Sequence, residues 1–233
     1  NRLGILVADY YEAMALFNQY CPSTNIAIMT HLADAKMTAA NMAQLESFKS
    51  ISVFHDHVSW ANSAGLSHPD WLSLGNWIRP GLLSHGVNPD GVFPMVKPVL
   101  SLYAQILQYY DLKVGDCVGY DRTWVATQPT RMAVVSIGYA DGLPQYGGSW
   151  HVVVNGQRCP VIGKVSMDLC SIDISSVPKV SIGDRVELVG PSQSLLELCD
   201  AMKVSPYVFV SGLGPRVSFL CQEEVPIKME DLE

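Results

Sequence analysis

The pattern of apolar residues changes near residue 98, and this change limits the folds that the chain can adopt. Up to about residue 97, short apolar runs alternate with segments of helical spacing. From residue 98 to residue 233, short runs rich in Val, Ile and Tyr follow one another, separated by turn residues. Gly and Pro cluster between Asn88 and Pro98, as they do in linkers. We therefore predict two domains, residues 1–97 and residues 98–233.

The first half predicts an α/β domain. Helices are expected at residues 9–19 and 36–48, and strands at residues 25–31, 51–54 and 77–83, the first of them buried. Asp9 has the position of an N-cap, and Glu12 the spacing of a capping box. Strands that alternate with helices predict parallel pairing with helical crossovers. Because a complete (β/α)8 barrel takes roughly 200–250 residues, this half is either a small open domain or part of a barrel.

The second half predicts an antiparallel sheet or a small β-barrel with one helix at residues 194–202. Asn155-Gly156 lies between two apolar runs, which is a strong signal for a type I′ hairpin turn. The expected strands are residues 99–110, 124–127, 132–137, 151–154, 161–165, 169–174 and 185–189.

Composition excludes several classes of protein. Hydrophobic residues make up 48% of the chain and charged residues 16%, the opposite of a disordered chain. The net charge is −7, and the absence of a Lys/Arg cluster argues against nucleic-acid binding. The longest uncharged stretch, Ala13–Ala33, is broken by polar residues and argues against a membrane span. Six scattered cysteines without a Cys-x-x-Cys pair predict buried, reduced thiols in a cytoplasmic protein.

Several strand ends carry residues that could perform chemistry. Tyr139 follows an apolar run in Ile137-Gly-Tyr-Ala-Asp-Gly142, where a phenol could be presented, although a turn aromatic packing on its sheet is the simpler interpretation. Asn62-Ser63 and Arg79-Pro-Gly81-Leu82 could offer a hydroxyl and backbone N–H groups to a phosphate. His31 ends another strand, where a structural hydrogen bond is the commoner role.

Other motifs give weaker evidence for a functional site. His55 and His57 lack a third ligand at a suitable spacing, so we do not expect a metal site. Ser205-Pro-Tyr207 is interpreted as a turn. Phosphate-binding loops, nucleophile elbows and dinucleotide-binding glycine motifs are absent from the sequence.

Taken in order, the short motifs resemble those of the alanine racemase family, pyridoxal 5'-phosphate enzymes of fold type III. Each motif is weak alone, but their common order over nearly the whole chain is specific. The matching strings are Asn1-Arg2-Leu-Gly4, Thr30-His31-Leu-Ala33, Ala61-Asn-Ser63-Ala64, Arg79-Pro-Gly81-Leu82, Ile137-Gly-Tyr139-Ala-Asp-Gly142, Gly163-Lys-Val-Ser-Met167-Asp168, Ser205-Pro-Tyr207 and Leu213-Gly-Pro-Arg216.

The resemblance implies a partial (β/α)8 TIM barrel followed by an antiparallel β domain, in a homodimer with shared active sites that interconverts L- and D-alanine for peptidoglycan. It also implies a two-base racemisation, in which one base removes the α-proton and an acid on the opposite face returns one. Tyr139 would be the base on one face, reaching into the partner's site. His31 would contact that phenol and link it to Arg79 at the pyridine nitrogen.

The same resemblance implies the remaining binding residues. Ser63, Gly81, Leu82 and Tyr207 would hold the cofactor phosphate. Arg2 and the backbone of Met167, the latter from the partner chain, would hold the carboxylate of the small amino-acid substrate.

The chain also departs from the family. The family's cofactor lysine lies in a Lys-Ala-Asn-Ala-Tyr-Gly-His-Gly string, which no lysine here matches, and Lys164 stands where Arg is usual. We therefore expect a missing N-terminal segment, supplied by a separate fragment, and no activity without it. Alternatives remain a broad-specificity or serine racemase domain, and a non-catalytic remnant acting as a binding or assembly module.

Overall fold

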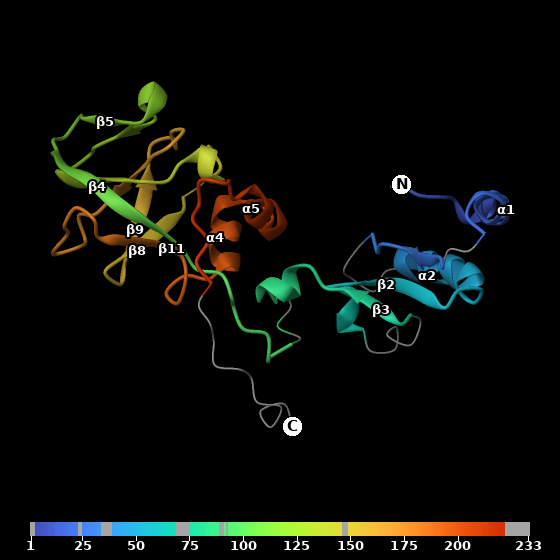
Figure 1. Cartoon of the computed structure of the whole chain (residues 1–233). Helices are drawn as coiled ribbons and strands as arrows, with labels where there is room; N and C mark the ends of the chain where they lie inside the picture. Colours follow the sequence, from blue (N-terminus) through green and yellow to red (C-terminus); the bar gives the residue numbers. More distant parts are fainter. Residues whose placement is uncertain are drawn as a thin grey trace. The chain divides into compact units, whose positions relative to one another are not determined.

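The computed structural model describes residues 3–22, 25–33, 39–68, 75–88, 91, 93–145 and 149–221. The chain divides into two compact units, Asn1–Val99 and Leu100–Glu233 (Figure 1). Among the described residues, no helix has both the length and the apolar character needed to cross a membrane.

The first unit contains a three-stranded parallel sheet in the order β1-β2-β3. The strands are β1 (Ala27–Met29), β2 (His57–Asn62) and β3 (Trp77–Arg79), and α2 (Ala39–Ser52) lies between β1 and β2 in the chain. The predicted parallel pairing is confirmed. Before the sheet come the 3-10 turn η1 (Val7–Asp9) and α1 (Tyr10–Tyr20). Two further 3-10 turns follow β2 and β3, namely η2 (Gly65–Ser67) and η3 (Leu82–His85).

One apolar cluster joins α2 to the sheet. Leu45 and Phe48 are three residues apart on α2, so they lie on the same face of the helix. They pack with Val58, Trp60 and Ala61 of β2, all of which are buried. This cluster fixes α2 against β2.

Three expectations for the first unit are wrong. Residues 51–54 form no strand, because Ile51 lies three residues beyond Phe48 and extends α2 onto the same apolar cluster, and β2 begins only at His57. Asp9 makes no side-chain capping bond, because it belongs to the preceding 3-10 turn and lacks the extended backbone of an N-cap. β1 is not buried, since it lies at an edge of the described sheet with Met29 58% exposed.

The second unit is built on a closed antiparallel barrel, which confirms the prediction of a small β-barrel. The strand order is β10-β7-β4-β11-β8-β9. A separate pair, β5 (Cys117–Val118) and β6 (Trp124–Val125), flanks the 3-10 turn η4 (Tyr120–Arg122). The barrel strands are β4 (Leu102–Leu112), β7 (Thr130–Val135), β8 (His151–Val154), β9 (Gln157–Ile162), β10 (Cys170–Asp173) and β11 (Arg185–Val189).

The expected hairpin turn is present. Asn155 and Gly156 have φ values of 49° and 76°, as a type I′ turn requires, and they join β8 to β9. Val152 and Val154 of β8 point into the barrel and are fully buried. The turn therefore fixes the register that puts these side chains in the core.

Two helices follow the barrel, one expected and one not. α4 (Leu195–Met202) begins at Ser194, whose side chain forms a capping box with Glu197. α5 (Pro206–Gly212) was expected as a turn. Ser205 caps it by accepting the N–H of Tyr207 at 3.3 Å, and Pro206 occupies its first position, where a missing N–H costs nothing. Figure 1 shows the two helices side by side, beside the barrel.

The cysteines are all free, but only half of them are buried. Burial raises the pKa of Cys159 and Cys199 to about 11 and that of Cys170 to about 12, because the thiolate loses its hydration. The other three are exposed, contrary to our expectation, namely Cys21, Cys117 and Cys221.

Candidate functional site

Polar residues gather at the carboxyl edge of the parallel sheet. Because β1, β2 and β3 run in the same direction, their carboxyl ends meet at one edge, where open α/β sheets bind ligands. The residues at or just beyond the ends of the three strands are Thr30-His31, Asn62-Ser63 and Arg79-Pro-Gly81-Leu82. The structure thus brings together five of the predicted site residues: His31, Ser63, Arg79, Gly81 and Leu82.

Arg79 is held by neutral acceptors. One terminal nitrogen donates to the Thr30 carbonyl at 2.8 Å, and the other donates to the hydroxyl of the buried Ser59. No carboxylate within the described part of the chain forms an ion pair with it, and burial lowers the pKa of the guanidinium from its ordinary value. The side chain stays cationic, with N–H groups left to donate. Its remaining N–H groups can donate to a further hydrogen-bond acceptor at this edge.

The backbone around His31 is fixed by α2. Gln44 donates to the His31 carbonyl at 2.7 Å and to the Thr30 hydroxyl at 2.9 Å. The imidazole Nε2 lies 3.5 Å from the amide nitrogen of Asn62. Arg79 donates to the carbonyl of Thr30, the residue before His31, so the two predicted residues come from neighbouring strand ends, and the direct link between them stays a prediction.

Ser63 organises the turn after β3. Its buried hydroxyl accepts the N–H of Gly81 at 2.9 Å and that of Leu83 at 3.4 Å. The N–H of Leu82, the first residue of η3, has no acceptor among the described residues. The Ser63 hydroxyl, which still has a proton to donate, and the N–H of Leu82 could together bind an anion such as a phosphate.

In the second unit, Tyr139 and Met167 are brought together. Tyr139 begins the 3-10 turn η5 (Tyr139–Asp141), which follows β7 after three residues, and its ring is exposed. Its N–H donates to the Ser166 carbonyl at 3.0 Å, and the N–H of Ala140 donates to the Met167 carbonyl at 2.9 Å. The phenol and the exposed Met167 therefore come from two segments joined by backbone hydrogen bonds.

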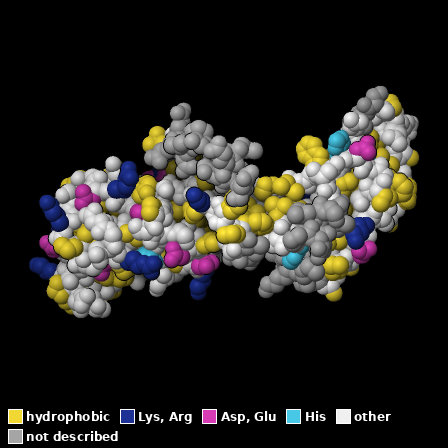
Figure 2. All heavy atoms as spheres, turned by 90° about the horizontal axis from the view of Figure 1, so that it is seen from below, with side chains coloured by type: hydrophobic (Ala, Val, Ile, Leu, Met, Phe, Trp, Pro, Cys, Tyr) yellow, Lys and Arg dark blue, Asp and Glu magenta, His cyan; other side chains and the backbone are white. Residues whose placement is uncertain are grey.

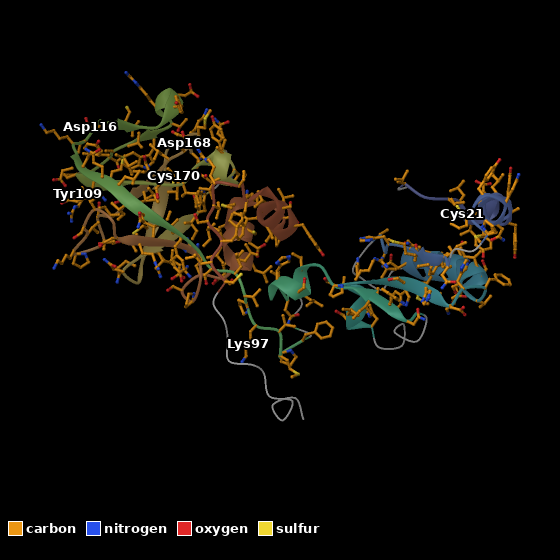
Figure 3. All side chains as sticks on the ribbon, in the orientation of Figure 1. Cys21, Lys97, Tyr109, Asp116, Asp168 and Cys170 are labelled. Atoms are coloured by element: carbon orange, nitrogen blue, oxygen red, sulfur yellow. The ribbon has the colours of Figure 1, made fainter. Side chains whose placement is uncertain are left out.

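An ionic cluster that the sequence did not predict lies beside this turn. Arg216 donates to Asp141 through Nε at 3.0 Å and Nη2 at 2.8 Å, and to Asp168 through Nη1 at 2.5 Å. The hydrogen bonds that the guanidinium donates to Asp168 and, to a smaller extent, to Asp141 raise its pKa. Figure 3 shows Asp168 on the segment next to η5. All three residues stand in the quoted motifs, but no local pattern indicates that they meet.

The remaining predicted residues lie elsewhere. Tyr207 is exposed at the start of α5 in the second unit, and Arg2 lies outside the described residues. His55 accepts or donates a 2.6 Å hydrogen bond with Tyr10, and His57 packs edge-on against Trp77. In the ranges that the structure describes, no three potential ligands form a metal site. On the face in Figure 2, Lys and Arg side chains stand apart from one another.

Comparisons with known proteins agree across both units. The family model for the alanine racemase C-terminal domain matches residues 99–221, and that for the alanine racemase N-terminal domain matches residues 1–89. The alanine racemase of Vesicomyosocius okutanii is 34% identical over 226 residues, which cover 94% of this chain and 64% of that protein. That of Cupriavidus metallidurans is 34% identical, with coverages of 93% and 62%.

Solved structures give the same result. Alanine racemase from Bartonella henselae, with covalently bound pyridoxal phosphate, superposes with a TM-score of 0.81 at 31% identity, over 93% of this chain and 62% of that one. The biosynthetic alanine racemase from Pseudomonas aeruginosa gives 0.77 at 32% identity, over 88% and 61%. The chain thus spans between 61% and 64% of the length of these relatives.

Proposed function

This chain belongs to the alanine racemase family, and we propose that it forms the larger part of a pyridoxal-phosphate-dependent racemase that supplies D-alanine for peptidoglycan in the cytoplasm. The observation that carries the proposal is the cluster of Arg79, Ser63 and Gly81 at the carboxyl edge of the sheet. In this proposal, residues 1–97 are part of a (β/α)8 barrel and residues 98–233 are the β domain. β1, β2 and β3 are then consecutive barrel strands.

The edge cluster fits pyridoxal phosphate. The phosphate would accept hydrogen bonds from the Ser63 hydroxyl and from the N–H of Leu82, with Tyr207 as a further donor. Gly81, whose N–H donates to Ser63, would let the turn approach the phosphate closely. Arg79 would face the pyridine nitrogen, where a guanidinium without a carboxylate partner donates a hydrogen bond and keeps its own proton. When bound, the cofactor withdraws electrons from the substrate's α-carbon, so that the α-proton becomes acidic.

Tyr139 would hold and move the proton on one face of the substrate, with its phenol oxygen as the reacting atom. His31 would orient that phenol by a hydrogen bond. Arg2 and the backbone N–H of Met167 would bind the substrate carboxylate. Since Tyr139 and Met167 lie on adjacent segments, both would enter the site of the partner chain in a homodimer.

The family's cofactor lysine has no counterpart among the sequence motifs of these 233 residues. We therefore assign that lysine to sequence outside residues 1–233, corresponding to the N-terminal part of the relatives, and expect these residues by themselves not to racemise alanine. The test is to produce the chain with and without the segment that precedes the matched region in the Vesicomyosocius okutanii racemase, and to measure D-alanine formation. Activity only in the combined sample supports the proposal.

Inactivity in both samples, together with failure to bind pyridoxal phosphate, would refute the proposal in favour of a non-catalytic module. Turnover of serine in preference to alanine would correct the substrate.

The phosphate site has a matched pair of variants. Ser63→Ala removes the buried hydroxyl that accepts the Gly81 N–H, whereas Ser84→Ala removes an exposed hydroxyl that donates to the Gly81 carbonyl at 2.6 Å. We expect Ser63→Ala to weaken pyridoxal phosphate binding about tenfold, the worth of one hydrogen bond to a charged group. Ser84→Ala is expected to leave it unchanged. Equal effects of the two variants would contradict the assignment.

A further inference from the structure

We infer that Arg216 is a positioning residue, which holds the turn that carries Tyr139 against the segment that carries Met167. The inference rests on the proposed function, in which Tyr139 moves a proton and Met167 meets the substrate carboxylate. It adds a residue to the reaction that contacts neither substrate nor cofactor.

The contacts place Arg216 between the two segments. Nε and Nη2 both donate to one oxygen of Asp141, the last residue of η5, and Nη1 donates to Asp168, next to Met167. One planar guanidinium thus binds a carboxylate on each segment. A lysine ammonium lacks this fixed fork of donors and cannot reproduce the geometry.

The second oxygen of Asp141 closes the turn itself. It accepts the N–H of Gly138 at 2.9 Å, so the residues on both sides of Tyr139 are tied to one carboxylate. The peptide carbonyl of Asp141 also accepts the N–H of Gly214 at 3.3 Å, which brings the segment that carries Arg216 to the turn. Rotation of the Tyr139 backbone would therefore break contacts on both sides.

The two ion pairs differ in strength. The Asp141 side chain is 11% exposed, whereas those of Asp168 and Arg216 are 55% and 50% exposed. Exposed pairs contribute little because water screens them, so the Asp141 pair dominates. Loss of Asp168 should therefore have a small effect on the Met167 segment. Loss of the guanidinium should have a larger effect, because it frees the Tyr139 turn as well.

The effect should remain local. The six barrel strands pair with one another in a closed ring that does not include residue 216. We therefore expect Arg216→Lys to keep the barrel while freeing the turn. Arg158→Lys is the matched control, since Arg158 makes one exposed contact with Glu197 at 3.9 Å, outside this cluster.

The first measurement is amide hydrogen exchange of the full chain at Tyr139 and Ala140, whose N–H groups bridge the two segments. Arg216→Lys should speed exchange at both amides at least about tenfold through local opening, and Asp168→Asn about threefold. Arg158→Lys should match the unmodified chain. Unchanged exchange in Arg216→Lys would overturn the inference. If that variant fails to fold, Asp168→Asn decides the same question.

The second measurement uses the chain combined with the N-terminal segment. Arg216→Lys should lower kcat by about 10–100-fold through misplacement of the phenol, with KM and the pyridoxal phosphate Kd within about threefold. The α-deuterium isotope effect should rise in the direction in which Tyr139 removes the proton, and not in the other. Because L- and D-alanine have equal free energies, kcat/KM falls alike in both directions in any variant, so the isotope effect is the deciding readout. A purely structural role would leave the isotope effects of both directions unchanged.

The two measurements separate the possible failures. Faster exchange without a change in kcat would refute the positioning role. If the unmodified combined sample is inactive, the proposed function fails and the catalytic role of Arg216 fails with it, while hydrogen exchange still decides whether Arg216 holds the turn.

Discussion

Gly138 immediately precedes Tyr139, and the structure leaves no room for a side chain there. A Cβ on Gly138 would lie 2.5 Å from the Met167 carbonyl carbon and 2.5 Å from the Ser166 oxygen. Non-bonded carbon atoms settle at about 3.5–4.0 Å, so in Gly138→Ala the two segments must separate by roughly 1 Å. The atoms in the way belong to the backbone, and no rotamer change can relieve the contact.

Two effects should lower the free energy of unfolding in Gly138→Ala. Overpacking of a well-packed site costs about 1–3 kcal/mol. Separation also lengthens the 3.0 Å bond from Tyr139 to Ser166 and the 2.9 Å bond from Ala140 to Met167, each with a net worth of about 1 kcal/mol. We therefore expect Gly138→Ala to lower the free energy of unfolding of the second unit by about 2–4 kcal/mol.

Gly212→Ala serves as a control, because it is expected to raise the free energy of unfolding slightly. Its Cβ would meet nothing closer than the Gly142 oxygen at 4.0 Å, at the last position of α5, where Ala is favoured over Gly by up to about 0.5 kcal/mol. Urea unfolding, followed by hydrogen exchange of β7 peptides, isolates the second unit from the first. A Gly138→Ala free energy within 0.5 kcal/mol of the original, about the error of such comparisons, would refute the close approach of the two segments.

Further predictions concern the second unit and the thiols. Ser194→Ala removes the cap of α4 and should lower the unfolding free energy by about 1 kcal/mol, whereas Ser211→Ala, on the exposed side of α5, should change it by less than about 0.5 kcal/mol in the same urea titration. A thiol reagent should label three cysteines of the native chain rapidly and the other three only after unfolding; the first group is Cys21, Cys117 and Cys221. Because burial raises the pKa of Cys170 to about 12, the unfolded chain releases this proton first as pH rises above about 9, and stability falls by about 1.4 kcal/mol per pH unit towards that value. Cys170→Ala lacks this contribution, so its urea midpoint should fall less steeply between pH 9 and pH 11; parallel slopes would contradict the assignment.

The features that the sequence predicted well are those set by neighbouring residues. Asn155-Gly156 specifies its own turn, because both residues tolerate positive φ, and the flanking strands follow from it. The same holds for Ser194 and Glu197, which cap α4 within one helical turn. In these cases, the physics that decides the structure acts over four residues or fewer.

The secondary-structure predictions are wrong where tertiary packing determines whether a segment forms a helix or a strand. The apolar run at residues 51–54 has strand composition, yet Ile51 completes the helical face begun by Leu45 and Phe48. β2 does not stand out in the sequence because it is short, begins and ends with the polar residues His57 and Asn62, and carries the buried Ser59 in its middle. α5 differs from the turn predicted at Ser205-Pro-Tyr207, although Ser205 followed by Pro206 is itself a sequence signal for the start of a helix.

The candidate site shows the same division. Motif order identifies Ser63, Arg79 and Tyr139 as candidates, and the carboxyl edge of a parallel sheet explains why the first two meet. The contact between Arg216 and Asp141 spans 75 residues and joins two loops. Local patterns carry no information about such a pair, and only the folded second unit shows it.

The outer strands of the parallel sheet have a practical consequence for handling the protein. β1 and β3 are the edges of this sheet within the described residues, and Met29, Trp77 and Ile78 on them are exposed. Unpaired edges that carry apolar side chains are templates for aggregation with other strands. Purification of the chain by itself should therefore yield oligomers that grow with concentration, and Met29→Lys, which places a charge on the β1 edge alone, should reduce their size.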